Sequence, residues 1–431
     1  MDKDPDFLIK KLDKIRGLNK SGIDLGLSRV ESLLKELGDP HKKIPPVIHV
    51  AGTNGKGSVI AMLRSILEEL DFTTHVFTSP HLVSYCERIR ISGEIIKPDY
   101  FSDLIDIISQ KNSSEAVTFF EFITVLAFLA FSKNPADFVL LETGLGGRLD
   151  ATNVIEKPLI TIITKIGIDH QKFLGEKIAE IAYEKAGIMK KNVTCLTAKQ
   201  EKEALMVIEQ VSKKLDLSLI YPDKDWSIIR DVKGYIYSDH KRILTLPEPS
   251  LPGSHQIDNM GVSVAAISYL NLYKDEKSLS RALLSVEWPG RCQKIYGGPI
   301  YDLLNDNWEL WLDGGHNLDA AKALSKWMED YPYQNILIFG IGITKDASGF
   351  LSIISRHANI IRTVSFKDGS YSFKPEELAK LALEKGFTNS EAKDSVYEAA
   401  KSLIPLMDNK KGRIIVCGSL YLVGEVLEKH F

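Results

Sequence analysis

The stretch from Val47 to Leu63, VIHVAGTNGKGSVIAML, constrains the fold of this chain more than any other. It opens on a short apolar run of β-prone residues, and the residues after Ser58 repeat apolar side chains at helical spacing. A glycine-rich turn lies between these two parts. Backbone N–H groups and a helix N-terminus can converge on an anion there, because glycine lets the chain approach a phosphate without Cβ clashes. The stretch therefore predicts a phosphate-binding loop in an α/β fold.

This loop departs from the common pattern G-x-x-x-x-G-K-[ST], because Gly57 stands between Lys56 and Ser58. Lys56 would neutralise the β- and γ-phosphates of a nucleotide, and the Ser58 hydroxyl would be available to Mg²⁺ near the first helical turn. An ordinary strand-to-helix connection is the alternative. The four special residue types at the right place favour a working loop.

Length and composition bound the class of protein. A chain of 431 residues is too long for one ordinary core, so two domains are expected. Its formal charge of -3 gives no drive toward nucleic acid or an anionic membrane. The most apolar run, Phe122 to Phe131, is too short to span a bilayer, and the N-terminus lacks the apolar core of a signal peptide. We therefore expect a cytoplasmic protein with neither a nucleic-acid nor a membrane partner.

The four cysteines have neither metal-ligand nor disulfide-framework spacing, and we interpret them as reduced packing residues. They are Cys86, Cys195, Cys292 and Cys417.

Strands and helices alternate along the whole chain, which predicts a largely parallel sheet with helices on both faces. The apolar runs DFVLLE, PLITIIT, VTCLTA, NILIFG and GRIIVCG are typical of buried parallel strands. Prolines and glycines cluster in VEWPGRCQKIYGGP, after which a new alternation begins. We place one domain over residues 1–288 and a second over residues 289–431.

Polar residues with chemical meaning follow several of the predicted strands. Ser79 follows HVF, Glu142 ends DFVLLE, and His170 follows PLITIIT a few residues later. Open α/β sheets bind ligands at these strand ends. Hydroxyl, carboxylate and imidazole groups are acceptable Mg²⁺ ligands. Each residue alone could be structural, but together beside a phosphate loop they indicate a metal site.

The motifs together resemble those of the folylpolyglutamate synthase and dihydrofolate synthase family, a branch of the Mur ligases. They run in the family's order from residue 24 to about residue 425. Among them are HVAGTNGKGS, TSPHL with ERIRISG, ETGLGGRLDATN, IGIDHQKFLG, IAYEKAGI, LPGSHQIDN, EWPGR and LDGGHN. In such ligases the loop is G-T-N-G-K-G-[ST], so the extra glycine is the family's own variant.

The resemblance implies an ATP-dependent amide ligase. ATP would phosphorylate the carboxylate of dihydropteroate or a reduced folate, L-glutamate would attack the acyl phosphate, and phosphate would leave. It also implies an N-terminal P-loop domain of the Mur-ligase ATPase type, a smaller Rossmann-like C-terminal domain, magnesium, in two sites, and a monomer.

Carried over residue by residue, the resemblance implies a set of ATP contacts, a set of metal ligands and a role for His316 in positioning glutamate or adenine. The lysine of the E-K-A-G-I motif, Lys185, would be carbamylated, which needs a depressed pKa because carbon dioxide adds only to a neutral amine. A solvated helix lysine is the alternative. The ATP contacts are Gly52, Thr53, Asn54, Gly55, Lys56, Gly57, Ser58, Asn259, Arg291 and Asp313. The metal ligands are Ser58, Ser79, Glu142, His170 and Lys185.

Three segments resemble the dihydropteroate-binding elements of bifunctional family members. Phe119 and Phe120 could flank a planar pterin, although an aromatic pair that opens an apolar helix is often core. The segments are Asp24, Leu25, Gly26 and Leu27; Thr118, Phe119, Phe120 and Glu121; and Leu149, Asp150 and Ala151.

Other functions stay open at this point. A P-loop NTPase that drives movement or switching would share the loop, lysine and metal ligands, but it would not need Asn259, Arg291 and Asp313. A nonenzymatic nucleotide-binding module would not need the metal set. Within the ligases, an enzyme that only extends polyglutamate, or one with another acceptor, competes with the bifunctional enzyme, which DLGL and TFFE favour.

Overall fold

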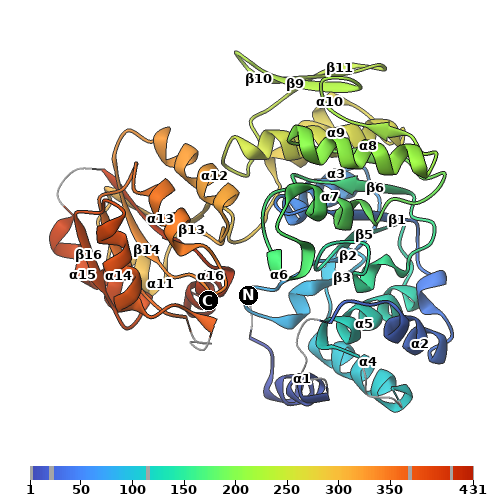
Figure 1. Cartoon of the computed structure of the whole chain (residues 1–431), viewed down its shortest axis with the longest axis horizontal. Coiled ribbons are helices and arrows are strands. Elements are labelled where there is room, and N and C mark those ends of the chain that lie inside the picture. The colour runs from blue at the N-terminus through green and yellow to red at the C-terminus, as the bar shows by residue number, and fades with distance from the viewer. Residues whose placement is uncertain (1–2, 19–23, 113–116, 367–370, 408–410, 431) are drawn as a thin grey trace. The chain divides into compact units, whose positions relative to one another are not determined.

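The computed structural model describes residues 3–18, 24–112, 117–366, 371–407 and 411–430. The chain divides into two compact units (Figure 1). The larger unit comprises Asp4–Ser250 and Ile257–Val286, and the smaller unit is formed mainly by Leu251–Gln256 and Glu287–Phe431. The segment 251–256 thus groups with the smaller unit, which a single division at residue 288 does not describe.

The larger unit is built on a mostly parallel sheet with the strand order β4-β3-β2-β5-β1-β6-β7-β8. β1 (Val47–Ala51) lies in the interior of the sheet and pairs in parallel with both β5 and β6. All five of its residues are buried, because helices cover both faces of the sheet (Figure 1). The other strands are β2 (Thr74–Phe77), β3 (Ile89–Ile91), β4 (Glu94–Ile95), β5 (Phe138–Glu142), β6 (Ile160–Ile163), β7 (Cys195–Thr197) and β8 (Leu219–Ile220).

Helices α4, α5 and α7 pack against the same face of this sheet, α4 and α5 against Val47 and Val139 and α7 against Ile163. α5 is apolar nearly all round and buried along most of its length, so the apolar run from Phe122 to Phe131 is the core of this unit. Among the described residues, no helix has the length and apolar character needed to cross a membrane. The helices are α1 (Asp6–Leu18), α2 (Ser28–Glu36), η1 (Pro40–Lys42), α3 (Lys56–Glu69), η2 (Tyr85–Arg88), α4 (Pro98–Lys111), α5 (Phe119–Lys133), η3 (Ala151–Val154), α6 (Gln171–Leu174), α7 (Ile178–Ala186), α8 (Lys202–Lys214), α9 (His255–Tyr269) and α10 (Glu276–Leu284).

A small antiparallel sheet with the order β11-β10-β9 follows the main sheet in the chain. Its strands are β9 (Trp226–Asp231), β10 (Gly234–Asp239) and β11 (Ile243–Leu246). Trp226 packs against Gly261 of α9, where an added Cβ would lie 2.4 Å from the indole ring. This sheet was not predicted from the sequence.

The smaller unit contains a second mostly parallel sheet, with the order β12-β13-β17-β14-β15-β16. β12 pairs with β13 in the antiparallel direction, and the other four described pairings are parallel. Its strands are β12 (Gln293–Ile295), β13 (Trp308–Asp313), β14 (Gln334–Phe339), β15 (Ile360–Thr363), β16 (Asn389–Ala392) and β17 (Gly412–Cys417). Its helices are α11 (Gly298–Tyr301), α12 (Leu318–Glu329), α13 (Ala347–Ile354), α14 (Pro375–Glu384), α15 (Val396–Leu403), η5 (Ile404–Leu406) and α16 (Leu420–His430).

The predicted α/β architecture is confirmed. Each of the five apolar runs contains a strand with parallel partners, namely β5, β6, β7, β14 and β17. The four cysteines are free and buried, as predicted.

Candidate active site

The glycine-rich loop connects β1 to α3, and two of its glycines are required by close packing behind the loop. Gly55 has a left-handed φ of 90° at the N-cap of α3. A Cβ there would lie 2.5 Å from Oδ1 of Asn259, and a Cβ on Gly52 would lie 1.9 Å from Oγ1 of Thr164. Any other residue at either position would push a neighbour away. Asn259, a predicted ATP contact, therefore packs directly against the loop.

The segment that follows β6, from Lys165 to Gly167, holds the middle of the glycine-rich loop in place. The N–H groups of Thr53 and Asn54 both donate to the carbonyl oxygen of Lys165, at 3.0 and 3.1 Å. The Thr53 hydroxyl donates to the carbonyl of Gly167 at 3.0 Å. These two loop residues are thus anchored to the segment that follows β6, the strand next to β1. The first turn of α3, which starts at Lys56, is therefore the part of the loop that can present N–H groups to an anion.

A basic and an acidic side chain meet beside the loop. Lys56 donates from Nζ to the carbonyl of Gly52 at 3.1 Å, and its Nζ lies 4.0 Å from Oε1 of Glu142 at the end of β5. Oε2 of the buried Glu142 accepts the N–H of Ser79 at 3.1 Å. Ser58 is buried in the first turn of α3. The structure thus brings the ends of β1, β2 and β5 together at one place.

Lys185 on α7 is the second lysine at this place. Its Nζ donates to the Gly52 carbonyl at 2.8 Å, and its side chain is buried. Burial and, to a smaller extent, the positive charge of Lys56 together lower the pKa of Lys185 to about 7, against the opposite effects of Asp169 and Asp150. A solvated helix lysine would be neither buried nor shifted, so that alternative is wrong.

His170 lies at the start of α6 and is exposed, with a left-handed φ of 52°. Its N–H donates to the Asp169 carboxylate at 2.8 Å. In the described part of the chain, no group of three or more His, Cys, Asp and Glu side chains could hold a metal ion. The predicted ligand set draws instead on hydroxyls, one carboxylate and a modified lysine, and His170 stays a predicted member of it.

The three predicted substrate segments converge, because α2, α5 and η3 pack against one another. Phe119 and Phe120 are half-buried at the edge of the apolar core, and an added Cβ on Gly144 would lie 2.3 Å from the Phe120 ring. The aromatic pair is thus neither fully buried nor fully exposed. Leu149 is half-buried, whereas Ala151 is buried in η3.

Asp150 holds its own loop in place. Its carboxylate is buried and accepts the N–H groups of Leu145 at 2.8 Å and Thr152 at 3.0 Å. Burial raises the pKa of Asp150. The Thr152 hydroxyl donates to Asp150 at 2.5 Å and lies 2.8 Å from Nε2 of His49 in β1. This chain of contacts ties the loop to the main sheet, so any contact of Asp150 with a substrate stays a prediction.

The smaller unit carries a separate polar turn at the end of β13. Oδ1 of Asp313 accepts the N–H of Gly315 at 2.9 Å, and Oδ2 accepts the N–H of Cys292 at 3.1 Å. This places Arg291, the neighbour of Cys292, beside the turn. Nδ1 of His316 lies 3.2 Å from the Gly314 carbonyl, with donor and acceptor roles that depend on the tautomer.

Sequence reasoning missed residues that support the site from distant parts of the chain. Thr164 and Lys165 hold the glycine loop, and Arg29 pairs with both Asp24 and Glu121. Thr164 ends a predicted strand, which is a usable signal once the strand order is known. The sequence does not indicate that Arg29 meets a carboxylate 92 residues away.

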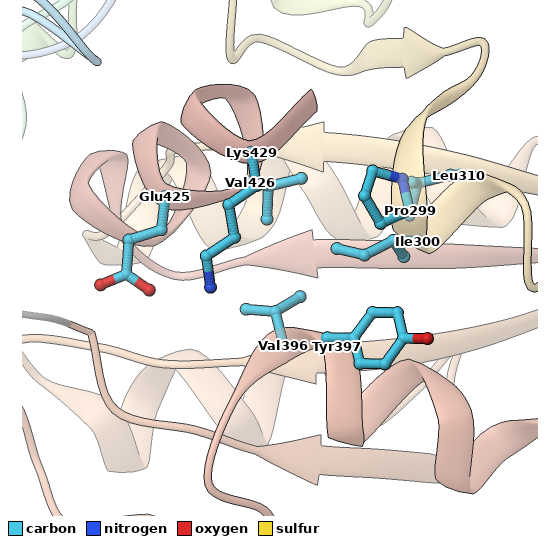
Figure 2. Close-up of a pocket in the computed structure, with 8 residues that line it drawn as sticks. All are labelled: Pro299, Ile300, Leu310, Val396, Tyr397, Glu425, Val426 and Lys429. Atoms are coloured by element: carbon cyan, nitrogen blue, oxygen red, sulfur yellow. The ribbon is translucent and has the colours of Figure 1, made fainter. Parts of the chain in front are cut away.

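A pocket in the smaller unit lies between α11, α15 and α16 (Figure 2). Ile300, Leu310, Val396 and Val426 line it, with the Lys429 side chain beside them. No predicted site residue is among its lining residues, so it is separate from the candidate active site.

Comparison with known proteins gives a consistent result. Residues 50–267 match the Mur ligase middle domain, and residues 299–429 match the dihydrofolate synthetase C-terminal domain. The chain is 32% identical to a dihydrofolate synthase/folylpolyglutamate synthase of Bacillus subtilis, over 96% of this chain and 97% of that protein.

Solved structures are similar over almost the whole chain. One is Escherichia coli FolC in complex with DHPP and ADP, with a TM-score of 0.86 and 28% identity, covering 99% of this chain and 98% of that one. Another is a bifunctional folylpolyglutamate synthase/dihydrofolate synthase with Mn, AMPPNP and L-glutamate bound, with a TM-score of 0.86 and 28% identity over 97% of both chains.

Proposed function

The chain belongs to the dihydrofolate synthase/folylpolyglutamate synthase family of Mur ligases, and we propose that it uses ATP to join L-glutamate to dihydropteroate and to reduced folates. The observation that carries this proposal is the cluster of Lys56, Lys185, Glu142 and Ser79 around the glycine loop. An ATP-dependent ligase needs such a cluster because it must bring two anions together before it forms a bond.

The chemistry follows from the weakness of a carboxylate as an electrophile. A substrate carboxylate oxygen attacks the γ-phosphorus of ATP and expels ADP, which leaves an acyl phosphate. The amino group of glutamate then attacks the acyl carbon, the tetrahedral intermediate expels phosphate, and the amine proton passes to solvent. Lys56 supports the first step by keeping a positive charge beside the phosphates, where the loop carbonyl of Gly52 holds its amine.

The residues beside the loop fit a divalent metal such as Mg²⁺. The buried Glu142 carboxylate, fixed by the Ser79 N–H, is a hard oxygen ligand, and Ser58 and Ser79 add hydroxyls. His170 would complete the set. When bound, Mg²⁺ neutralises phosphate charge. The relative with Mn and AMPPNP bound supports the use of a metal and a nucleotide.

We further propose that Lys185 is carbamylated and serves a second Mg²⁺. Its burial and its low pKa keep a large fraction of the amine neutral near pH 7, which carbon dioxide requires. The product is a carboxylate at the end of a long side chain, placed beside the loop carbonyl of Gly52.

The acceptor and the nucleotide draw on further residues. Asn259 packs against the loop in the larger unit, and Arg291 and Asp313 belong to the polar turn of the smaller unit; we assign all three to ATP. We assign His316 to glutamate or adenine. The segments around Asp24–Leu27, Thr118–Glu121 and Leu149–Ala151 are assigned to dihydropteroate and the reduced folates.

The proposed partners are ATP, L-glutamate, dihydropteroate and reduced folates. Free, buried thiols suit a reducing compartment, which supports a cytoplasmic location. A monomeric state stays a prediction.

Product mass spectrometry tests the function. The purified protein is incubated with Mg-ATP and L-glutamate in two tubes, one with dihydropteroate and one with tetrahydrofolate. We expect a glutamyl mass increment in both tubes. An increment with tetrahydrofolate alone would reduce the protein to a polyglutamate extender, and no increment in either tube would contradict the proposal.

A further inference from the structure

Arg29 of α2 joins two of the predicted substrate segments, although it was not itself predicted to bind anything. Its Nη2 donates to Oε1 of Glu121 at 2.8 Å, and its Nε lies 3.2 Å from both carboxylate oxygens of that residue. Its Nη1 pairs with Oδ2 of Asp24 at 2.8 Å, and Nη2 also donates to the Asp24 carbonyl at 2.7 Å. One guanidinium therefore holds both segments.

The two ends of this contact differ in their environment. The Glu121 side chain is 4% exposed, the Arg29 side chain 23% and the Asp24 side chain 46%. Oε2 of Glu121 also accepts the N–H of Thr118 at 2.6 Å, which closes the capping box at the start of α5. Arg29 thus connects the capped start of α5 to the more exposed segment that contains Asp24.

The Glu121 carboxylate is already engaged by these groups. It accepts hydrogen bonds from Arg29 and from the Thr118 backbone, so a substrate would have to compete with a charged donor and a helix cap. The Glu121 carboxylate thus holds both Arg29 and the start of α5.

The segment held by Arg29 lies against half-buried apolar side chains. Gly26 sits close over the guanidinium, where an added Cβ would lie 3.9 Å from Nη2. Leu27, Phe119 and Phe120 all pack partly buried against the same apolar core. Apolar and aromatic faces of this kind suit a flat heterocycle.

We propose that Arg29 is a positioning residue that latches the Asp24–Leu27 segment to the start of α5 and so sets the affinity for the pterin-bearing substrate. The proposal rests on the proposed function. A lysine cannot replace this arginine, because a single ammonium cannot reach two carboxylates and a carbonyl with the planar fork that Arg29 uses.

Steady-state kinetics with dihydropteroate test the latch. Arg29→Lys should raise the KM for dihydropteroate about tenfold, while kcat and the KM for ATP stay within about twofold, because the latch affects binding and not phosphoryl transfer. Arg281→Lys is the matched control, since Arg281 pairs with Glu69 at 2.8 Å on another part of the larger unit. The Arg281→Lys variant should keep the wild-type kcat and the wild-type KM values for dihydropteroate and ATP.

A double-mutant cycle separates positioning from direct contact. Asp24→Asn leaves the exposed segment uncharged and should also raise the KM. The variant that carries both Asp24→Asn and Arg29→Lys should be no worse than the poorer single variant, because both changes break one latch.

Effects that multiply would show that Arg29 and Asp24 act independently and not as one latch, which would overturn the proposal. So would an unchanged KM, or a fall in kcat and in melting temperature with no selective rise in the KM for dihydropteroate. The wild-type protein in the same assay tests the proposed function separately. If only the latch proposal is wrong, the wild-type protein still adds glutamate to dihydropteroate.

Discussion

At the scale of single residues, the buried Lys185 has a strongly shifted pKa, which affects both its protonation and the stability of the fold. Burial, helped by the nearby Lys56 charge, lowers its pKa to about 7. Between about pH 7 and pH 10 the unfolded chain therefore binds one more proton here than the native protein does. The contribution of Lys185 to the free energy of unfolding therefore rises with pH across that window. In the native protein the amine is increasingly neutral above pH 7. Burial of Lys185 therefore lowers the free energy of unfolding at neutral pH, and it does so at the residue for which we propose carbamylation.

Carbamylation of Lys185 should be visible by ¹³C NMR after addition of ¹³C-bicarbonate. We expect a carbamate signal that grows as the pH rises through about 7 and that is absent in Lys185→Ala. That variant should lose about a hundredfold or more in ligase activity, as expected when a metal ligand is removed. Lys191→Ala, which changes an exposed lysine on the same segment, should keep both the signal and the activity. A signal that survives in Lys185→Ala would contradict the assignment.

The glycine loop is the element to which we assign nucleotide binding. Its shape is set by packing, because Thr164 and Asn259 fill the space behind Gly52 and Gly55. The loop is also bonded to the Lys165 carbonyl, so it keeps its form without a ligand. A preformed loop offers the first turn of α3 to phosphate at little cost in ordering.

Gly55→Ala should damage both stability and nucleotide binding. The left-handed φ of 90° alone costs about 1–2 kcal/mol for alanine, and the new Cβ must displace Asn259. We expect ATP affinity to fall about tenfold or more by calorimetric titration. Gly17→Ala is the control: Gly17 lies in α1 with no atom within 4 Å of an added Cβ, and this change should stabilise the protein by about 0.5–1 kcal/mol. Wild-type ATP affinity in Gly55→Ala would refute this account of the loop.

Elements with strong local patterns could be predicted from the sequence, and contacts between distant segments could not. The apolar runs became β5, β6, β7, β14 and β17 because strands buried on both faces need continuous apolar residues. The strands of the sheet β9–β11 mix polar and apolar residues and form no continuous apolar run, so this sheet was missed. The latch between Arg29 and Glu121 depends on how α2 packs on α5, which no local pattern contains.

The whole molecule combines two units that each carry part of the predicted machinery. The larger unit holds the loop, Lys56, Lys185 and the substrate segments, and the smaller unit holds the Asp313 turn. The family resemblance in the sequence covered both units, and the relatives are similar along nearly the whole chain. Our central proposal is that the protein activates a carboxylate with ATP.

An oxygen tracer tests that claim most directly. Dihydropteroate is labelled with ¹⁸O in its carboxylate and incubated with the protein, Mg-ATP and L-glutamate, and the released phosphate is analysed by mass spectrometry. The acyl phosphate route predicts one ¹⁸O atom in each phosphate, because the carboxylate oxygen that attacks ATP leaves with the phosphoryl group. Unlabelled phosphate formed together with the glutamyl product would contradict it.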